Sequence, residues 1–283
     1  MTDSLPSASS SNLSRFTFIG GGNMGRSLIG GLIARGIGAE RITVVDPTAA
    51  TREGLIHDFG IQATADATTV LPGSALVLLA VKPQVMREVC GGLASVFPAD
   101  AVAVSIAAGI TTGQLETWLG GNRAVVRAMP NTPALLGAGA TGLCANARTT
   151  PAQRLLAGTA LDAVGLSVWL EDEQQMDVVT ALSGSGPAYF FLLVEALQAA
   201  AQAQGLPEAA ARALAAQTCL GAGRMLVESG EAAADLRHRV TSPGGTTQAA
   251  LESFQRDDFE AIVSRAVAAA VQRGAELSRQ AGN

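Results

Sequence analysis

Apolar residues in the first half of the chain occur in short runs, which are separated by stretches with helical spacing. The runs are rich in Val, Ile and Leu without polar alternation, as is typical of strands buried on both faces. They lie at 16–19, 42–45, 76–79, 102–106 and 125–128. Between the first two runs, Met24, Leu28 and Leu32 recur at helical spacing. This alternation predicts a doubly wound parallel α/β sheet over residues 15–170.

The pattern changes after residue 170. Strand-like runs end, and alanine-rich segments with helical spacing follow at 188–204, 208–228, 246–255 and 259–280. Gly205-Leu206-Pro207 provides a helix C-cap followed by a helix start. We therefore predict an all-helical domain over residues 171–283. Alanine at most helix contacts allows close approach, which would suit helices interleaved between two subunits.

Composition narrows the class of protein. Residues 1–14 are serine-rich without an apolar segment, so we expect a disordered tail and not a signal peptide. The longest apolar run, 188–194, is too short to span a bilayer and is closed by Glu195, so we expect a cytoplasmic protein with no membrane partner. A net charge of -5 argues against nucleic-acid binding. The three cysteines have no metal-ligand spacing, so no metal site is expected.

A glycine-rich loop follows the first predicted strand. Gly20, Gly22 and Gly25 form the pattern G-x-G-x-x-G at a helix start, with Asn23 and Met24 between the last two. The first glycine permits a tight turn, the second lets a pyrophosphate approach the backbone, and the third lets the helix pack on the strand. The loop predicts a Rossmann-type dinucleotide site rather than a turn that serves packing alone.

Asp46 ends the second predicted strand, about 20 residues after the last glycine, as the dinucleotide fingerprint requires. A carboxylate here accepts hydrogen bonds from the ribose hydroxyls and repels a 2′-phosphate, which favours NADH. The alternative is that Asp46, followed by Pro47, caps the next helix.

Two further loops follow predicted strands, where ligands bind in open α/β sheets. Ala80, Val81, Lys82 and Pro83 follow the third run, and Lys82 is the only lysine in the chain. We predict that this loop contacts the cofactor; the alternative is a charge that simply reaches solvent.

A stiff turn at Met129, Pro130 and Asn131 follows the fifth run. It could position a nicotinamide ring or merely reverse the chain. We favour a cofactor contact because of its place at a strand end.

Histidine, tyrosine and lysine are scarce as candidate acid–base groups, since the chain has only His57, His238, Tyr189 and Lys82. An alcohol dehydrogenase needs a group that removes the hydroxyl proton as hydride leaves. A protonated imine already carries the charge that attracts hydride, so the inventory favours reduction of a C=N bond. Both histidines are expected at the surface.

Two glycine-rich motifs precede predicted helices in the second half. In Ser183–Tyr189, Ser185 or Gly186 could cap the helix or bind a ligand directly. In Thr241–Thr247, paired glycines expose successive amides that suit a carboxylate, and two threonines bring hydroxyl groups to the same place.

From Phe16 onward the sequence resembles the pyrroline-5-carboxylate reductase family. The matching motifs are 20–25, 80–84, 127–134, 183–189 and, above all, RVTSPGGTTQAALE at 239–252. The resemblance implies an N-terminal Rossmann domain, a C-terminal helical dimerisation domain, and a homodimer that is often assembled into a decamer of five dimers. It also implies the NAD(P)H-dependent reduction of 1-pyrroline-5-carboxylate to L-proline.

The resemblance further implies the roles of individual residues. Thr247 would be the catalytic residue, hydrogen-bonded to the pyrroline nitrogen. Ser242, Gly244, Gly245 and Thr246, together with Thr247, would bind the substrate carboxylate.

One departure from the family concerns the cofactor. Family members that contact the 2′-phosphate of NADPH often have Ser after the second strand and Asn before the third, where this chain has Asp46 and Ala67. We therefore expect use of NADH or of both cofactors. The alternative functions are reduction of a related cyclic imino acid, or a dinucleotide-binding sensor without turnover.

Overall fold

The computed structural model describes residues 14–282, which divide into two compact units. The first unit comprises the chain up to Gly184 together with the residues from Gln272 onward, and the second is Ser185–Val271. Most of the predicted tail, residues 1–13, lies outside the described residues. Ser14 is described, and its carbonyl oxygen accepts hydrogen bonds from the Arg41 guanidinium.

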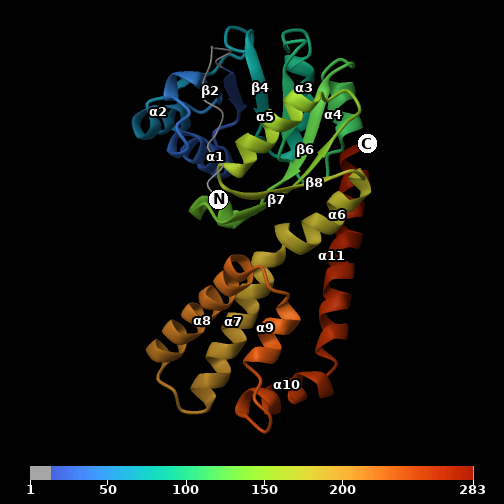
Figure 1. The fold of residues 1–283 in the computed structure, drawn as a ribbon. Coiled ribbons are helices and arrows are strands. Elements are labelled where there is room, and N and C mark those ends of the chain that lie inside the picture. The colour runs from blue at the N-terminus through green and yellow to red at the C-terminus, as the bar shows by residue number, and fades with distance from the viewer. Residues whose placement is uncertain (1–13, 283) are drawn as a thin grey trace. The chain divides into compact units, whose positions relative to one another are not determined.

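The first unit is built on one eight-stranded sheet in the order β3-β2-β1-β4-β5-β6-β7-β8 (Figure 1). The strands are β1 (Arg15–Ile19), β2 (Ile42–Val45), β3 (Gln62–Thr64), β4 (Ser74–Leu79), β5 (Val102–Ser105), β6 (Ala124–Met129), β7 (Gly139–Ala145) and β8 (Gly165–Leu170). All neighbouring pairs are parallel except β6 and β7. The strand order reverses between β1 and β4, which is where a doubly wound sheet opens a crevice for its ligand.

The five predicted strands are confirmed as β1, β2, β4, β5 and β6, and they are parallel to one another as predicted. The sequence pattern did not predict β7. This strand has the sequence GATGLCA and runs antiparallel to β6. Its glycines are needed for close packing, because a Cβ at Gly142 would lie 2.7 Å from a methyl carbon of Val179. The run of branched residues that reveals a buried strand is therefore missing here.

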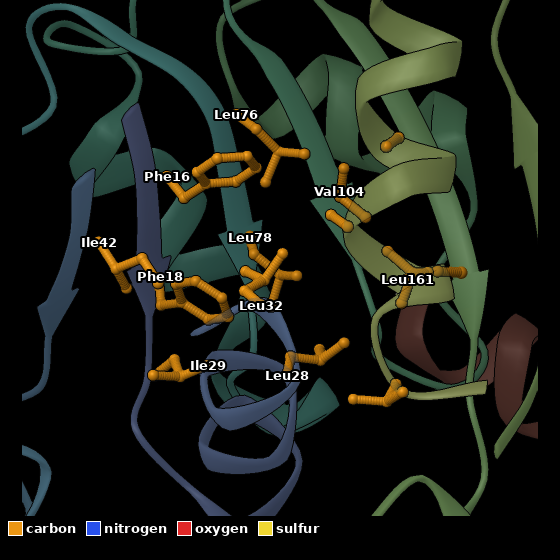
Figure 2. Packing of buried hydrophobic residues seen from close by; sticks show 14 of the residues in the cluster. Phe16, Phe18, Leu28, Ile29, Leu32, Ile42, Leu76, Leu78, Val104 and Leu161 are labelled. Atoms are coloured by element: carbon orange, nitrogen blue, oxygen red, sulfur yellow. The ribbon is translucent and has the colours of Figure 1, made fainter. Parts of the chain in front are cut away.

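Helices cover both faces of the sheet. The first core lies under α1 (Asn23–Ala34), α2 (Ala49–Phe59) and α5 (Pro151–Asp162), and the second under α3 (Pro83–Leu93) and α4 (Thr112–Trp118). Leu28 and Leu32 of α1 belong to the same buried cluster as Phe18 of β1 and Leu161 of α5 (Figure 2). The 3₁₀ turns η1 (Ala39–Arg41), η2 (Thr132–Leu136) and η3 (Glu173–Gln175) also belong to this unit.

The second unit is helical, as predicted. Its helices are α7 (Gly186–Ala203), α8 (Glu208–Ser229), α9 (Ala233–Arg239), α10 (Thr246–Arg256) and most of α11 (Phe259–Gly282). The sequence pattern missed the short α9, in which the exposed His238 lies.

Between β8 and α7, the chain forms η3, α6 (Met176–Val179) and a π-helical turn at Thr180–Gly184. We call residues 172–184 the connecting segment. The sheet ends at Leu170, close to the predicted domain boundary, but the connecting segment still belongs to the first compact unit.

Candidate cofactor and substrate sites

The glycine-rich loop follows β1 and leads into α1. Gly20 has φ +99°, and a Cβ there would lie 2.8 Å from the carbonyl oxygen of Ala80. A Cβ on Gly25 would lie 3.0 Å from the carbonyl oxygen of Gly20. A Cβ on Gly22 would meet nothing within 4 Å. Two of the three fingerprint glycines are thus required by packing, whereas Gly22 faces open space, as a pyrophosphate-binding position must.

The start of α1 offers unpaired donors to that space. Gly22 is the N-cap and has no side chain to cap the helix. Within the described residues, the amides of Asn23, Met24 and Gly25 donate to no acceptor. Free amides at a helix N-terminus form an anion site. The residues present therefore fit the pyrophosphate of a dinucleotide.

Asp46 joins the end of β2 to this loop. Its Oδ2 accepts a hydrogen bond of 2.8 Å from the amide of Gly21, and its Oδ1 accepts one of 2.8 Å from the amide of Thr48. Thr48 is the N-cap residue of α2, so Asp46 supports both the cofactor loop and the turn into the helix. Each carboxylate oxygen retains a second lone pair for a ligand, and the two interpretations of Asp46 are compatible.

The other predicted cofactor loops begin at the same edge of the sheet, because parallel strands end together. Ala80 follows β4, and its amide donates to the carbonyl of Ile19 in β1. Val81 is half-buried, whereas Lys82 is exposed as the N-cap residue of α3, with Pro83 at the first helical position. These residues adjoin the glycine-rich loop, and the exposed Lys82 side chain is compatible with both interpretations.

Asn131 follows β6 and is committed to internal bonds. Its side-chain amide donates to the carbonyl of Ser183 at 3.0 Å, and its Oδ1 accepts from the amide of Ala140 at 2.9 Å. Met129 also contacts the connecting segment, because a Cβ on Gly184 would lie 2.8 Å from its terminal carbon. The Met129–Asn131 turn is therefore fixed to the connecting segment, and the Asn131 side chain positions the turn.

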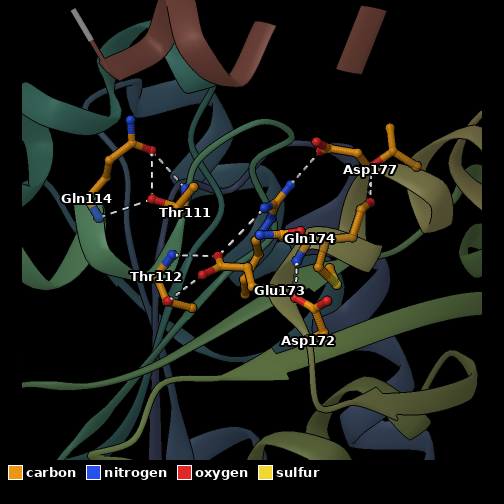
Figure 3. A network of polar contacts seen from close by, with 10 residues as sticks. Thr111, Thr112, Gln114, Asp172, Glu173, Gln174 and Asp177 are labelled. Atoms are coloured by element: carbon orange, nitrogen blue, oxygen red, sulfur yellow. Dashed lines mark hydrogen bonds and ion pairs between the residues drawn. The ribbon is translucent and has the colours of Figure 1, made fainter. Parts of the chain in front are cut away.

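A buried arginine forms a second link to the connecting segment (Figure 3). Arg127 of β6 lies 3.3 Å from Asp177 Oδ1 and 3.6 Å from Glu173 Oε1. Glu173 also accepts hydrogen bonds of 2.7 Å from both the amide and the hydroxyl of Thr112, at the start of α4. Sequence reasoning missed this network, although an arginine inside the apolar run 125–128 was the available signal.

The predicted substrate loop lies in the second unit. Gly244 has φ +70°, which favours glycine, and α10 begins at Thr246 with Gly245 as its N-cap. Neither Thr246 nor Thr247 has a side-chain hydrogen bond within the described part of the chain. Simple capping therefore does not explain the two hydroxyl groups.

The amides of this loop are only partly free. The amide of Gly244 donates to Gln248 Oε1 at 2.8 Å, and the amide of Gly245 donates to the carbonyl of Ser242. Among the described residues, the amides of Thr246 and Thr247 have no acceptor. A carboxylate could use these two at once, whereas Gln248 must turn away before Gly244 can contribute.

The other predicted motif, at 183–189, spans the division between the two units. Ser185 is the N-cap residue of α7, but its side chain makes no capping hydrogen bond. Ser183 donates its hydroxyl to the carbonyl of Val179. Ser183 therefore stabilises the π-helical turn. The sequence pattern did not indicate this turn.

Comparison with known proteins identifies the family. Residues 15–109 match the family described as NADP oxidoreductase, coenzyme F420-dependent, and residues 173–277 match pyrroline-5-carboxylate reductase dimerisation. A pyrroline-5-carboxylate reductase of Pseudomonas aeruginosa is 51% identical over 268 residues, which cover 95% of this chain and 98% of that protein. The chain belongs to the pyrroline-5-carboxylate reductase family.

Solved structures agree with this membership. A pyrroline-5-carboxylate reductase of Coxiella burnetii has 42% identity and a TM-score of 0.91, covering 94% of this chain and 99% of that one. A pyrroline carboxylate reductase of Plasmodium falciparum, solved with NADP bound, has 27% identity and a TM-score of 0.80, covering 94% and 98%. The fold is an N-terminal NAD(P)-binding sheet followed by the helical dimerisation domain of this family.

The dimerisation domain accounts for an unusual surface on the second unit. Many large apolar side chains of its helices are exposed, including Phe190, Phe191 and Leu192 of α7 and Val227 of α8. The helical stretch Glu173–Ala203 is long and apolar enough to cross a membrane by length and composition. Only 11% of its most apolar 18 residues are buried in the single chain. Because these residues lie in the matched dimerisation region, the apolar faces fit contacts between subunits, and the protein is a homo-oligomer.

Proposed function

We propose that the protein reduces 1-pyrroline-5-carboxylate to L-proline with NAD(P)H. The observation that carries this proposal is the 51% identity to a curated pyrroline-5-carboxylate reductase over 95% of the chain, which includes both glycine-rich loops. The geometry supports it, because each loop leads into a helix whose first amides have no acceptor in the described part of the chain.

The residues proposed to hold the cofactor lie around the switch between β1 and β4. The amides from Gly22 to Gly25, including those of Asn23 and Met24, would bind the pyrophosphate, with Gly20 forming the turn. Asp46 would accept the adenosine ribose hydroxyls, and the loops at 80–83 and 129–131 would flank the nicotinamide half. The nicotinamide supplies the hydride when it is bound.

The proposed substrate loop would act by orientation. The amides of Thr246 and Thr247 would hold the carboxylate, with Ser242, Gly244 and Gly245 shaping the turn. The Thr247 hydroxyl would hydrogen-bond the ring nitrogen and fix C5 for hydride addition. No acid or base is needed to generate the electrophile, because a protonated imine already carries the charge.

The cofactor preference that fits these residues is NADH, with NADPH also accepted. Asp46 stands where a serine would contact a 2′-phosphate, and Ala67 packs against the second core and offers no polar group. We further propose a homodimer, or a decamer of five dimers, in the cytoplasm, without a nucleic-acid or membrane partner.

Two alternatives remain distinct from this proposal. A reductase of a six-membered or sulfur-containing cyclic imino acid would use the same loops with a different ring. A sensor without turnover would bind the dinucleotide alone. The start of α10 instead suits a second small molecule, because its two threonine hydroxyls have no partner among residues 14–282.

The test is a comparison of kcat/KM for the five-membered, six-membered and sulfur-containing imines with each cofactor. We expect 1-pyrroline-5-carboxylate to be the preferred ring. A larger kcat/KM for another imine would identify that imine as the substrate in place of 1-pyrroline-5-carboxylate. Dinucleotide binding without turnover of any imine would favour the sensor.

A further inference from the structure

Arg52 lies beside the part of the cofactor site where NADH and NADPH differ. It belongs to the first turns of α2, directly after the loop that contains Asp46. This end of α2 adjoins the cofactor loop, because a Cβ on Gly21 would lie 2.9 Å from a methyl carbon of Thr51. The position therefore flanks the adenosine ribose, which the carboxylate after β2 binds in dinucleotide folds.

The guanidinium of Arg52 is fixed by only one of its nitrogens. Nη1 donates to the carbonyl of Asp46 at 2.7 Å and to the carbonyl of Pro47 at 2.9 Å. In the described part of the chain, Nε and Nη2 have no hydrogen-bond acceptor and no carboxylate within ion-pair distance. A planar cation is thus held next to Asp46 with N–H groups to spare.

The two side chains have complementary chemistry. The Asp46 carboxylate accepts hydrogen bonds and suits a 2′-hydroxyl, whereas it repels a 2′-phosphate. A guanidinium with free N–H groups suits a phosphate, which it can bind through two parallel hydrogen bonds. The other nearby arginine, Arg26, is already paired with Asp58 and stacked on Phe59.

We propose that Arg52 is a specificity-determining residue that binds the 2′-phosphate of NADPH and thereby offsets its repulsion by Asp46. This inference rests on the proposed function, since it assigns the adenosine end of the same cofactor site. Under it, Asp46 serves NADH and Arg52 serves NADPH, so one corner of the site accepts both cofactors.

The test measures binding of two adenosine nucleotides by titration calorimetry, so that it does not depend on turnover. Adenosine 2′,5′-bisphosphate represents the NADPH end and adenosine 5′-phosphate the NADH end. For Arg52→Gln, we expect binding of the bisphosphate to weaken by about tenfold or more, because a charge-assisted contact is lost. Binding of adenosine 5′-phosphate should stay within about twofold of the full-length wild-type protein.

Arg35→Gln is the matched control, because it removes the same charge at the far end of α1. It should change neither affinity. Equal weakening of both nucleotides by Arg52→Gln would mean that Arg52 only stabilises the turn, and unchanged binding of both would mean that it contacts neither; either result overturns the proposal.

Measuring turnover as well as binding distinguishes a failure of this inference from a failure of the proposed function. The ratio of kcat/KM for NADPH to that for NADH should fall in Arg52→Gln in parallel with bisphosphate binding. Wild-type protein that binds the bisphosphate through Arg52 but reduces no imine would refute the proposed reaction and leave the assignment of Arg52 standing.

Discussion

At the scale of single residues, Gly20 and Gly22 lie in one loop but in different surroundings: Gly20 is closely packed, whereas Gly22 faces open space. Gly20→Ala places a Cβ against the carbonyl of Ala80 at φ +99°, so we expect a loss of about 2 kcal/mol of stability. Gly22→Ala meets open space and should keep the melting temperature of the wild type. It should nevertheless weaken dinucleotide binding about tenfold, because the methyl group blocks the approach of the pyrophosphate.

Thermal unfolding and dinucleotide titration, run on both glycine variants, check this pair. Wild-type dinucleotide affinity in Gly22→Ala would contradict the placement of the pyrophosphate at this loop.

Among the residues that the structure describes, the Thr247 hydroxyl has no hydrogen-bond partner, which suits a role toward substrate. Thr247→Ala should lower kcat/KM by about 10- to 100-fold if one oriented hydrogen bond to the transition state is lost. Thr247→Ser keeps the hydroxyl and should retain most of the activity. Steady-state kinetics with the imine decide, and an unchanged kcat/KM in the alanine variant would exclude Thr247 from the mechanism.

Residue-level chemistry was predictable where it depends on local pattern. The glycine spacing predicted the tight turn at Gly20 and the close packing at Gly25, because each follows from its distance along one strand–helix turn. The contact of Gly22 with a pyrophosphate stays a prediction. The internal bonds of Asn131 were not predictable, since its partner Ser183 is 52 residues away in the sequence. Whether Asn131 also contacts the cofactor through its backbone stays a prediction.

At the scale of elements, the Arg127 network joins β6, the start of α4 and the connecting segment. Arg127→Ala should cost about 3 kcal/mol, because it leaves the largely buried carboxylates of Glu173 and Asp177 without their cation. Arg224→Ala is the control: it breaks an exposed ion pair in α8 and should cost less than about 0.5 kcal/mol. Urea unfolding measures both, and equal costs would contradict a structural role for the network.

The thiol of Cys90 in α3 makes stability depend on pH. Burial raises the pKa of this thiol to about 12. The thiol ionises more readily in the unfolded chain than in the folded protein. The contribution of the buried neutral thiol to folding stability is therefore fully present below about pH 8.5, and it is lost as the pH rises toward the folded pKa. Wild-type protein should therefore lose up to about 1.4 kcal/mol more stability per pH unit than Cys90→Ala above that value.

Unfolding midpoints between neutral and alkaline pH, measured for both proteins, provide the check. Parallel pH profiles for wild type and Cys90→Ala would show that the thiol does not contribute.

Strands were predictable from the sequence where they consist of a continuous run of apolar residues. The five central parallel strands consist of apolar runs and were found, whereas β3 and β8 lie at the edges of the sheet and have mixed exposure. The antiparallel β7 was missed because glycine replaces the branched residues that mark strands. Its direction depends on contacts with β6 and β8 that no local pattern contains.

At the scale of the whole molecule, the exposed apolar faces of the helical unit predict stable association. Light scattering at micromolar concentration should give a dimer or a multiple of it. Phe191→Glu should shift the population toward monomer, because Phe191 is 68% exposed in the single chain and a charge there opposes burial against a partner. A wild-type monomer at this concentration would contradict the account.

The most direct test of the central claim is hydride transfer itself. Folded protein is incubated with 1-pyrroline-5-carboxylate and with NADH or NADPH deuterated at the transferring position, and the product is examined by mass spectrometry. We expect proline that carries a single deuterium at C5, formed in step with oxidation of the cofactor. Absence of labelled proline with both cofactors would contradict it.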